Sequence, residues 1–198
     1  IYSITVSSLS SLSDGSHDIT ATATDAANNV SVASTPLTVM VDTTAPVITL
    51  GGDAEVEIEV GESYTEDSAT SDGGETVFST GSVNTSAVGT YTITYAATDA
   101  AGNVAQEVTR TVIVEDNIAP VITLAGDAVV TLEVGGSYDE QGVTVSDNYD
   151  TGLTVTIDSS AVNMSALDSY SVIYSATDSS GNKAVEVTRM VTVVDNTP

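Results

Sequence analysis

The residues of this chain best suited to chemistry are the aspartates and asparagines of a motif that occurs three times. The segment TDAAGN covers residues 98–103, TDSSGN covers 177–182 and the related TDAANN covers 24–29. Aspartate and asparagine offer the carboxylate and amide oxygens that Ca²⁺ prefers as ligands. They also form tight turns, in which an aspartate side chain accepts backbone N–H groups and glycine adopts positive φ. Two interpretations stand: a turn that binds calcium, and a turn alone.

Catalytic chemistry has little support in the sequence. A serine nucleophile needs a neighbouring base, and the only histidine, His17, lies in an alternating segment typical of a strand. Pairs of carboxylates can hydrolyse glycosides, but the chain has no tryptophan and a single phenylalanine, Phe78, to form a sugar-binding platform. We therefore expect a protein that is not an enzyme.

The elements that must position the motif belong to an internal repeat. The segment APVITLGGDAEV at residue 45 returns as APVITLAGDAVV at residue 119, an offset of 119 − 45 = 74 residues. The segment YTITYAATDAAGN at residue 91 returns as YSVIYSATDSSGN at residue 170, an offset of 170 − 91 = 79 residues. The second copy therefore has 79 − 74 = 5 extra residues, which fall near SDNYDTGL. Length variation of this kind is typical of a surface loop.

Apolar residues alternate with a period of two, which indicates strands. Along residues 91–98, mostly large side chains alternate with small, mostly polar ones, as in a half-buried antiparallel strand. Tyr91 and Tyr170 begin matching strands and are expected to form the corner at which a tyrosine of an immunoglobulin-type sandwich bonds back across a turn. The predicted fold class is all-β, with tandem immunoglobulin-like β-sandwiches arranged as a rod. The strands expected in the first full module are Val47–Leu50, Glu55–Val60, Ser63–Thr70, Thr76–Ser79, Ser82–Asn84, Thr90–Thr98 and Val104–Val114.

The repeat divides the chain into three expected parts. Residues 1–41 hold three strands, within YSITVSS, HDITATATD and VSVASTPLTVMV. They are interpreted as the C-terminal part of a truncated module, which either preceding residues or a partner chain would complete. Three strands bury one face at best, so this part is expected to expose apolar side chains. Full modules are expected at 42–115 and 116–198.

Charge is the strongest compositional feature. The formal net charge is −25, with 28 acidic residues against Arg110, Lys183 and Arg189. Nucleic acid is excluded as a partner, because its binding depends on lysine and arginine contacts to phosphates. Either the acidic surface is simply solvated, or bound divalent cations offset part of the charge. No run of 18 or more apolar residues occurs, so direct membrane insertion is not expected.

The two full modules resemble a known family. The segments DTTAPVITLGGDAEVEIEVGESY and NTSAVGTYTITYAATDAAGN, with their second copies, are similar to the bacterial Ig-like repeats of large surface adhesins and secreted proteins. The first segment, with LSDGSHDITATATDAANN, resembles a related Ig-like subtype of the same adhesins. The resemblance implies stalk modules of a secreted or cell-surface bacterial adhesin, with neighbouring modules as partners and calcium at their junctions.

One fold of this kind supports many functions. The alternatives are a carbohydrate- or surface-binding accessory module of a secreted protein, with a glycan or cell-surface ligand, and a subunit of a surface layer or filament.

Topology predicts the ligands of a calcium site. In a seven-stranded sandwich with its termini at opposite ends, the turn between the last two strands lies beside the incoming linker. The turn before the third strand reaches the same end. The expected ligands are Asp42, Glu62 or Glu66, Asp99 and Asn103 in the first full module, and Asp116, Glu140, Asp178 and Asn182 in the second.

Four other polar residues are interpreted differently. Asp147 and Asp150 lie in SDNYDTG, which we expect at the opposite end of the module, either as a solvated loop or as another metal site. Arg110 and Arg189 share the strand face of neighbouring valines, so each either follows a bulge or pairs with a buried carboxylate.

Overall fold

The computed structural model describes residues 12–197. Every regular element in this range is a β-strand, from β1 to β14, so the all-β fold class is confirmed. None of these residues form a helix long and apolar enough to cross a membrane.

Residues 12–41 contain one antiparallel pair, β1 (Gly15–Ile19) with β2 (Leu37–Val41). The strand expected within residues 2–8 lies outside the described residues. A two-stranded sheet covers little apolar surface. The most exposed large apolar side chains here are Val30 at 63%, Val32 at 92%, Leu37 at 65% and Met40 at 72%.

Both of these strands are shorter than the sequence pattern predicts, because serine hydroxyls interrupt the backbone ladder. The Ala21 N–H donates to Ser34 Oγ at 3.0 Å, and the Ala23 N–H donates to Ser31 Oγ at 2.9 Å. Pro36 has no N–H to contribute to a ladder, so β2 begins after it.

Residues 48–115 form two sheets. The smaller pairs β3 (Ile48–Leu50) with β5 (Ala69–Ser71) in antiparallel fashion. The larger has the order β4-β8-β7-β6 and consists of β4 (Glu55–Glu59), β6 (Phe78–Thr80), β7 (Gly89–Ala96) and β8 (Val108–Glu115). Alternate residues of the long strands are buried, as the period of two predicts. They are Ile93 and Tyr95 of β7 and Arg110, Val112 and Val114 of β8.

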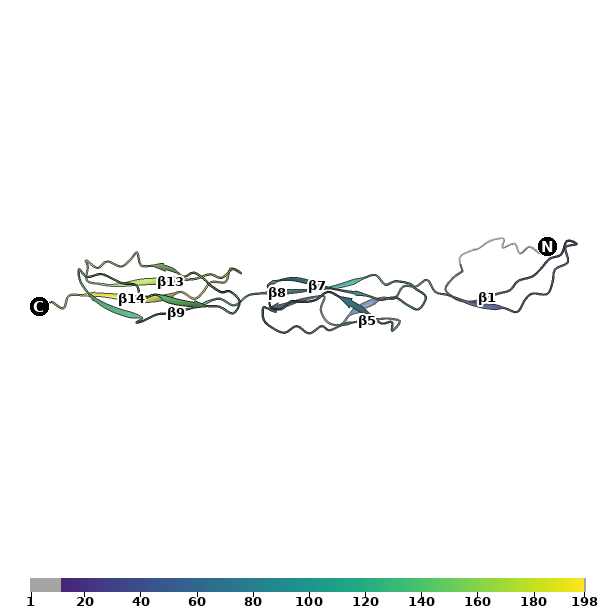
Figure 1. The fold of residues 1–198 in the computed structure, drawn as a ribbon, viewed down its shortest axis with the longest axis horizontal. Helices are drawn as coiled ribbons and strands as arrows, with labels where there is room; N and C mark the ends of the chain where they lie inside the picture. The colour runs from purple at the N-terminus through teal and green to yellow at the C-terminus, as the bar shows by residue number, and fades with distance from the viewer. Residues whose placement is uncertain (1–11, 198) are drawn as a thin grey trace. The chain divides into compact units, whose positions relative to one another are not determined.

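Residues 121–194 repeat this arrangement. The smaller sheet pairs β9 (Val121–Leu124) with β11 (Val143–Ser146). The larger has the order β10-β14-β13-β12, with β13 and β14 side by side (Figure 1). Within it, β10 runs parallel to β14, whereas the other neighbours are antiparallel. Its strands are β10 (Val129–Glu133), β12 (Thr156–Asp158), β13 (Ser169–Ser175) and β14 (Val187–Val194).

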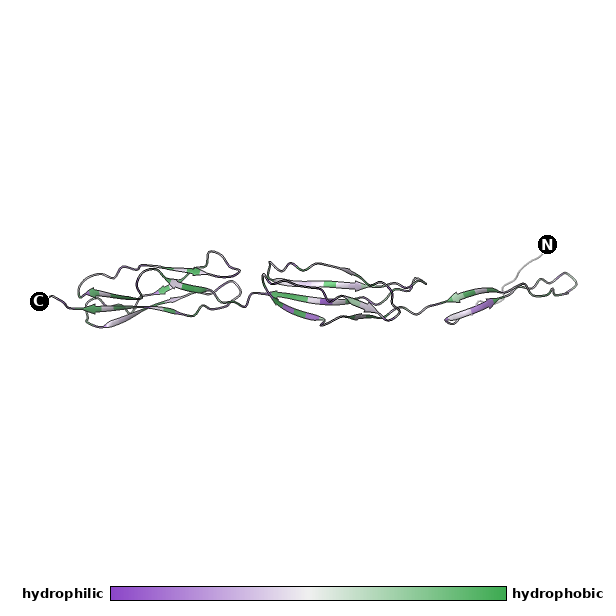
Figure 2. Cartoon of the chain, turned by 90° about the horizontal axis from the view of Figure 1, so that it is seen from below, coloured by the Kyte–Doolittle hydropathy of each residue, from purple (hydrophilic) through white to green (hydrophobic). Residues whose placement is uncertain are grey.

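One apolar core joins the two sheets of residues 121–194. Ile122 of β9 packs in the same buried cluster as Val172 of β13 and Val191 of β14. The strands carry hydrophobic stretches (Figure 2), and every second residue of β14 is buried from Arg189 through Val191 to Val193. The sheets therefore pack face to face, as in a β-sandwich.

Six strands form in each full module, so the prediction of seven is wrong. The segment Ser82–Asn84 is a loop, in which Asn84 Oδ1 accepts the Ser86 N–H at 3.1 Å. Side-chain bonds of this kind compete with a backbone ladder. The strand expected at Ser63–Thr70 begins only at residue 69, because Ser68 has a φ of 63°, outside the β region.

The tyrosine corner forms as expected in the second full module. The Tyr170 hydroxyl donates to the carbonyl of Ala166 at 3.2 Å, back across the turn that precedes β13. Val172, two residues later, is fully buried. This contact holds the start of β13 against the turn that precedes it.

Candidate metal site

The repeated motif forms the same turn in all three copies. Its aspartate N–H donates to the carbonyl of the residue four positions later at 3.0 to 3.1 Å, and that residue's N–H donates back to aspartate Oδ1 at 2.7 to 2.9 Å. The fourth residue after the threonine has positive φ in each copy. It is Asn28 at 67°, Gly102 at 95° and Gly181 at 97°.

Substitution of Gly102 tests this turn. Gly102→Ala is expected to lower the free energy of unfolding by about 1 to 2 kcal/mol, because an alanine is strained at positive φ. A Cβ at this position would meet no atom within 4 Å, so the cost is conformational. Gly102→Asn is expected to cost less, since Asn28 adopts positive φ in the first copy. Urea unfolding of the full chain measures both, and an alanine variant as stable as the parent would contradict the assignment.

The asparagine of the motif connects the turn to the linker before its module. Asn182 Nδ2 donates to the Asp116 carbonyl at 2.8 Å and to Asp178 Oδ2 at 2.9 Å. In the first full module, Asn103 Nδ2 donates to the Asp42 carbonyl at 3.1 Å. The structure thus brings each turn to the linker residue that the sequence predicts.

Four aspartates converge at the linker of the second full module. One carboxylate oxygen from each of Asp116, Asp147, Asp150 and Asp178 lies within 4.8 Å of the other three. Asp147 and Asp150 were expected at the opposite end of the module, and that expectation is wrong. Because β11 runs antiparallel to β9, with Ser146 opposite Val121, the loop after β11 lies beside the linker before β9.

Two oxygens of this cluster are buried without a hydrogen-bond partner among the described residues. They are Asp116 Oδ2 and Asp147 Oδ1. Asp116 is 4% exposed and Asp178 is 7% exposed. Buried polar atoms are nearly always paired, and a buried charge is usually compensated by an opposite charge or a metal. The cluster therefore has the features expected of a cation site.

Burial shapes the electrostatics of the cluster. It raises the pKa of the Asp116 carboxyl above the ordinary value, and repulsion from Asp147 and Asp178 acts in the same direction. Hydrogen bonds from the Ile118 N–H and the Ser180 side chain oppose this rise in pKa without reversing it. Burial also acts to raise the pKa of Asp178, but hydrogen bonds to the motif lower it overall.

Local hydrogen bonds hold the loop carboxylates in place. Asp147 Oδ2 accepts the N–H groups of Tyr149 and Asp150, both at 3.0 Å, which leaves Oδ1 available. The Asp150 carboxylate accepts the Ser179 N–H and the Ser179 hydroxyl, each at 2.7 Å. Ser179 belongs to the repeated motif, so this contact joins the loop after β11 to the turn.

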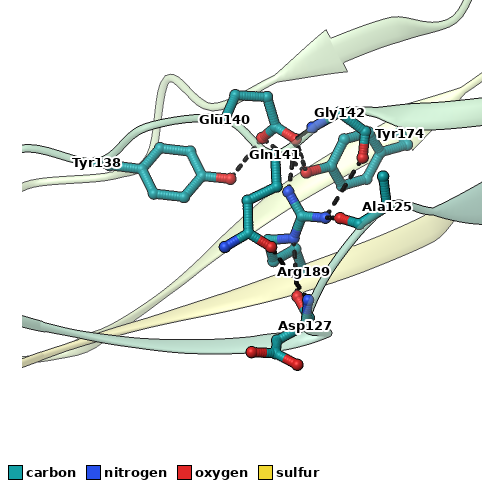
Figure 3. A network of polar contacts seen from close by, with 8 residues as sticks. All are labelled: Ala125, Asp127, Tyr138, Glu140, Gln141, Gly142, Tyr174 and Arg189. Carbon is teal, nitrogen blue, oxygen red and sulfur yellow. Dashed lines mark hydrogen bonds and ion pairs between the residues drawn. The ribbon is translucent and has the colours of Figure 1, made fainter.

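Glu140 lies in a different network, away from the four aspartates. It accepts from Arg189 Nη1 at 2.5 Å, from the Tyr174 hydroxyl at 2.7 Å and from the Tyr138 hydroxyl (Figure 3). Arg189 is fully buried and also donates to the Asp127 carbonyl at 3.0 Å. Glu140 therefore compensates a buried guanidinium instead of joining the carboxylates that surround Asp116.

The first full module has the same network. Arg110 is 1% exposed and pairs with Glu66, while its Nε donates to the Asp53 carbonyl at 2.7 Å. Of the two interpretations of the arginines, pairing with a carboxylate is confirmed. The other glutamate considered as a ligand, Glu62, is exposed, and its N–H closes a turn with the Glu59 carbonyl at 3.1 Å.

Two of the remaining predicted ligands of the first full module, Asp42 and Asp99, line an open hollow. Its volume is ≈ 260 Å³. Asp42 is exposed, and its Oδ1 accepts the Thr44 N–H at 3.0 Å. In the described part of the chain, only the four aspartates named above form a group of three or more candidate ligands. The acidic residues that line the hollow are Asp42, Asp72, Glu75 and Asp99.

Comparison with known families agrees with this tandem β-sandwich architecture. Residues 48–114 and 122–193 match the family described as bacterial surface protein, Ig-like domain, and residues 2–65 match the bacterial Ig-like domain, group 3. The chain therefore belongs to the family of bacterial surface protein Ig-like domains. Membership indicates an extracellular surface module, and domains of these families are typically not enzymes.

Individual proteins are also similar to this chain. Hyalin from Strongylocentrotus purpuratus is 32% identical over 201 residues, which cover 93% of this chain and 17% of hyalin. A lipoprotein from Bacteroides thetaiotaomicron shares 23% identity at a TM-score of 0.33, over 67% of this chain and 60% of that one. Drosophila N-cadherin EC1-3 shares 13% identity at a TM-score of 0.29, over 77% of this chain and 68% of that one. The chain thus spans only part of the length of these proteins.

Proposed function

We propose that the chain forms stalk modules of a secreted or cell-surface bacterial adhesin, and that calcium stiffens the junction at Asp116. The main support for a calcium site is the group of four aspartates, two of whose oxygens are buried without a hydrogen-bond partner. Calcium takes six to eight oxygen ligands. Four carboxylates, with backbone carbonyls and water, can supply that number.

The charge of the cluster favours calcium over magnesium, and its spacing accommodates calcium. At Ca–O distances of about 2.3 to 2.6 Å, opposite ligands lie about 4.6 to 5.2 Å apart, whereas Mg–O distances of about 2.0 to 2.1 Å require about 4.0 to 4.2 Å. The four oxygens all lie within 4.8 Å of one another, a limit that calcium fits. Magnesium is also usually bound by only one or two carboxylates.

Stiffening follows from where the ligands lie in the chain. Asp116 belongs to the linker, Asp147 and Asp150 to the loop after β11, and Asp178 to the turn after β13. One ion bound by all four ties the linker to the module that follows it. The linker then has fewer conformations, so the junction bends less and the stalk holds its distal part farther from the cell.

The test compares the full chain in calcium and in chelator. Calcium at ten times its dissociation constant is expected to stabilise the folded state by about 1.4 kcal/mol, and at a hundred times by about 2.7 kcal/mol. Thermal melting measures this stabilisation, and small-angle X-ray scattering measures the maximum dimension, which is expected to increase or to narrow in distribution.

Two controls sharpen this test. Magnesium at the same concentration is expected to have a smaller effect, and Glu186→Gln, at an exposed position, is expected to keep the full response to calcium. Identical melting curves and scattering profiles in calcium and in chelator would contradict the proposed stiffening.

A further inference from the structure

The two full modules differ at the positions that surround the candidate site. The motif reads TDAAGN in the first and TDSSGN in the second, so Ser179 and Ser180 stand where the first module has Ala100 and Ala101. The loop after the second strand of the smaller sheet reads SDGGE in the first module and SDNYD in the second. These sequence differences fall in the two segments whose hydrogen bonds hold the aspartates in place.

Ser179 of the second module contacts the cluster directly. Its hydroxyl and its N–H both donate to the Asp150 carboxylate, each at 2.7 Å. Alanine has no hydroxyl, so Ala100 cannot make the side-chain contact that Ser179 makes. The turn itself does not depend on this hydroxyl, because its backbone bonds are the same in both modules.

The acidic residues of the first module are engaged locally instead. Asp72 Oδ1 accepts the Val47 N–H at 2.9 Å, and Glu75 accepts the Ser71 hydroxyl. Asp42, which corresponds to Asp116, is exposed, whereas Asp116 is 4% exposed. Within the described residues, unpaired buried side-chain oxygens occur only in the second module's cluster.

We propose that the chain has one tight calcium site, built by the second full module, and that TDSSGN with SDNYD is the cation-binding form of a repeat whose TDAAGN form is only a turn. This inference rests on the proposed function, because it takes calcium to be the cation. It adds that junctions in such an array are not equivalent. A stalk that contains both forms has some junctions stiffened by calcium and others that do not depend on it. The form of the motif in each module determines which kind of junction it makes.

Calcium titration of the full chain tests this inference. Isothermal titration calorimetry of chain stripped of metal is expected to show one tight site per chain. Asp147→Asn and Asp150→Asn are each expected to weaken binding by at least about tenfold, because each removes a charged ligand. The matched substitutions Asp42→Asn and Asp99→Asn, in the first module, are expected to leave affinity and stoichiometry unchanged.

Ser179 is a positioning residue, so its test needs a readout that a folding defect would not mimic. Ser179→Ala is expected to weaken calcium binding by about tenfold, the lower end of the cost of replacing a residue that orients a metal ligand. Its melting temperature in chelator should stay close to that of the parent, and Ser179→Thr should restore binding. Equal calcium affinity of the alanine variant and the parent would contradict the positioning role.

The outcomes separate this inference from the proposed function. One site that is lost with Asp178→Asn but kept with Asp99→Asn supports the inference. Two sites of similar affinity, or one lost with Asp99→Asn, overturn it while leaving calcium stiffening intact. No calcium uptake by the parent chain overturns both.

Discussion

Glu140→Ala is expected to destabilise the second full module by about 3 to 5 kcal/mol, because it leaves a buried guanidinium without a counter-charge. Arg189 is fully buried and contacts Glu140 at 2.5 Å, and the Tyr138 and Tyr174 hydroxyls lose their acceptor as well. Urea unfolding of the full chain, followed by hydrogen exchange of the β13 and β14 amides, measures the effect in this module rather than in the first.

Two controls accompany this substitution. Glu186→Ala, at an exposed position, is expected to change the free energy of unfolding by no more than about 0.5 kcal/mol. Exchange of the β7 amides should be unaffected, since the first module keeps its own pair of Arg110 and Glu66. If Glu140→Ala lowers the free energy of unfolding by less than about 1 kcal/mol, another group must compensate the charge of Arg189.

The same pair gives stability a defined dependence on pH. Burial acts to raise the pKa of Glu140, but hydrogen bonds from Tyr138, Tyr174 and the Gly142 N–H, with the charge of Arg189, lower it below the ordinary value of 4.5. A carboxyl whose pKa is lower in the folded state contributes stability above its unfolded pKa and loses it as the pH falls through its folded pKa. The stability difference between the parent and Glu140→Gln should therefore be constant near neutral pH and shrink in acid.

Asp116→Asn is expected to have opposite effects with and without calcium. In chelator it should raise the free energy of unfolding by about 1 to 3 kcal/mol, because it removes one of four mutually repelling carboxylates. At an effective dielectric constant of about 20, two unit charges no more than 4.8 Å apart repel by at least about 3.5 kcal/mol. In calcium the variant loses a ligand, so the parent should be the more stable of the two.

The comparison needs four melting curves, of the parent and the variant in calcium and in chelator. Asp42→Asn is the matched control, since it removes the same charge from the corresponding, exposed position of the first module. A variant that destabilises the chain equally in both solutions would indicate that Asp116 has a structural role in the linker and no role in binding a cation.

Much of the fold could be predicted from the sequence, because its determinants are local. Alternation of apolar residues identified β7, β8, β13 and β14, whose inward faces bury the valines and tyrosines of that pattern. The prediction failed where a side chain competes with the backbone ladder, as Asn84 does, or where the backbone leaves the β region, as at Ser68.

The membership of the site was only partly predictable. Asp116 and Asp178 follow from the position of a turn beside a linker, and the structure does bring them together. Glu140 was chosen because its turn reaches the same end, but the buried charge of Arg189 binds it instead. Asp147 and Asp150 were assigned to the other end, although the five extra residues and the change from Ala-Ala to Ser-Ser marked this module as different.

The sequence by itself determined the repeat, the strands and the turn of each TDxxGN motif, since each depends on residues close together in the chain. Only the tertiary structure decided which carboxylates share a site. Antiparallel pairing of β9 with β11 places the loop of Asp147 and Asp150 beside the linker, and burial there leaves Asp116 Oδ2 without a partner. Strand pairing and burial depend on contacts between distant residues, so no local pattern reveals them.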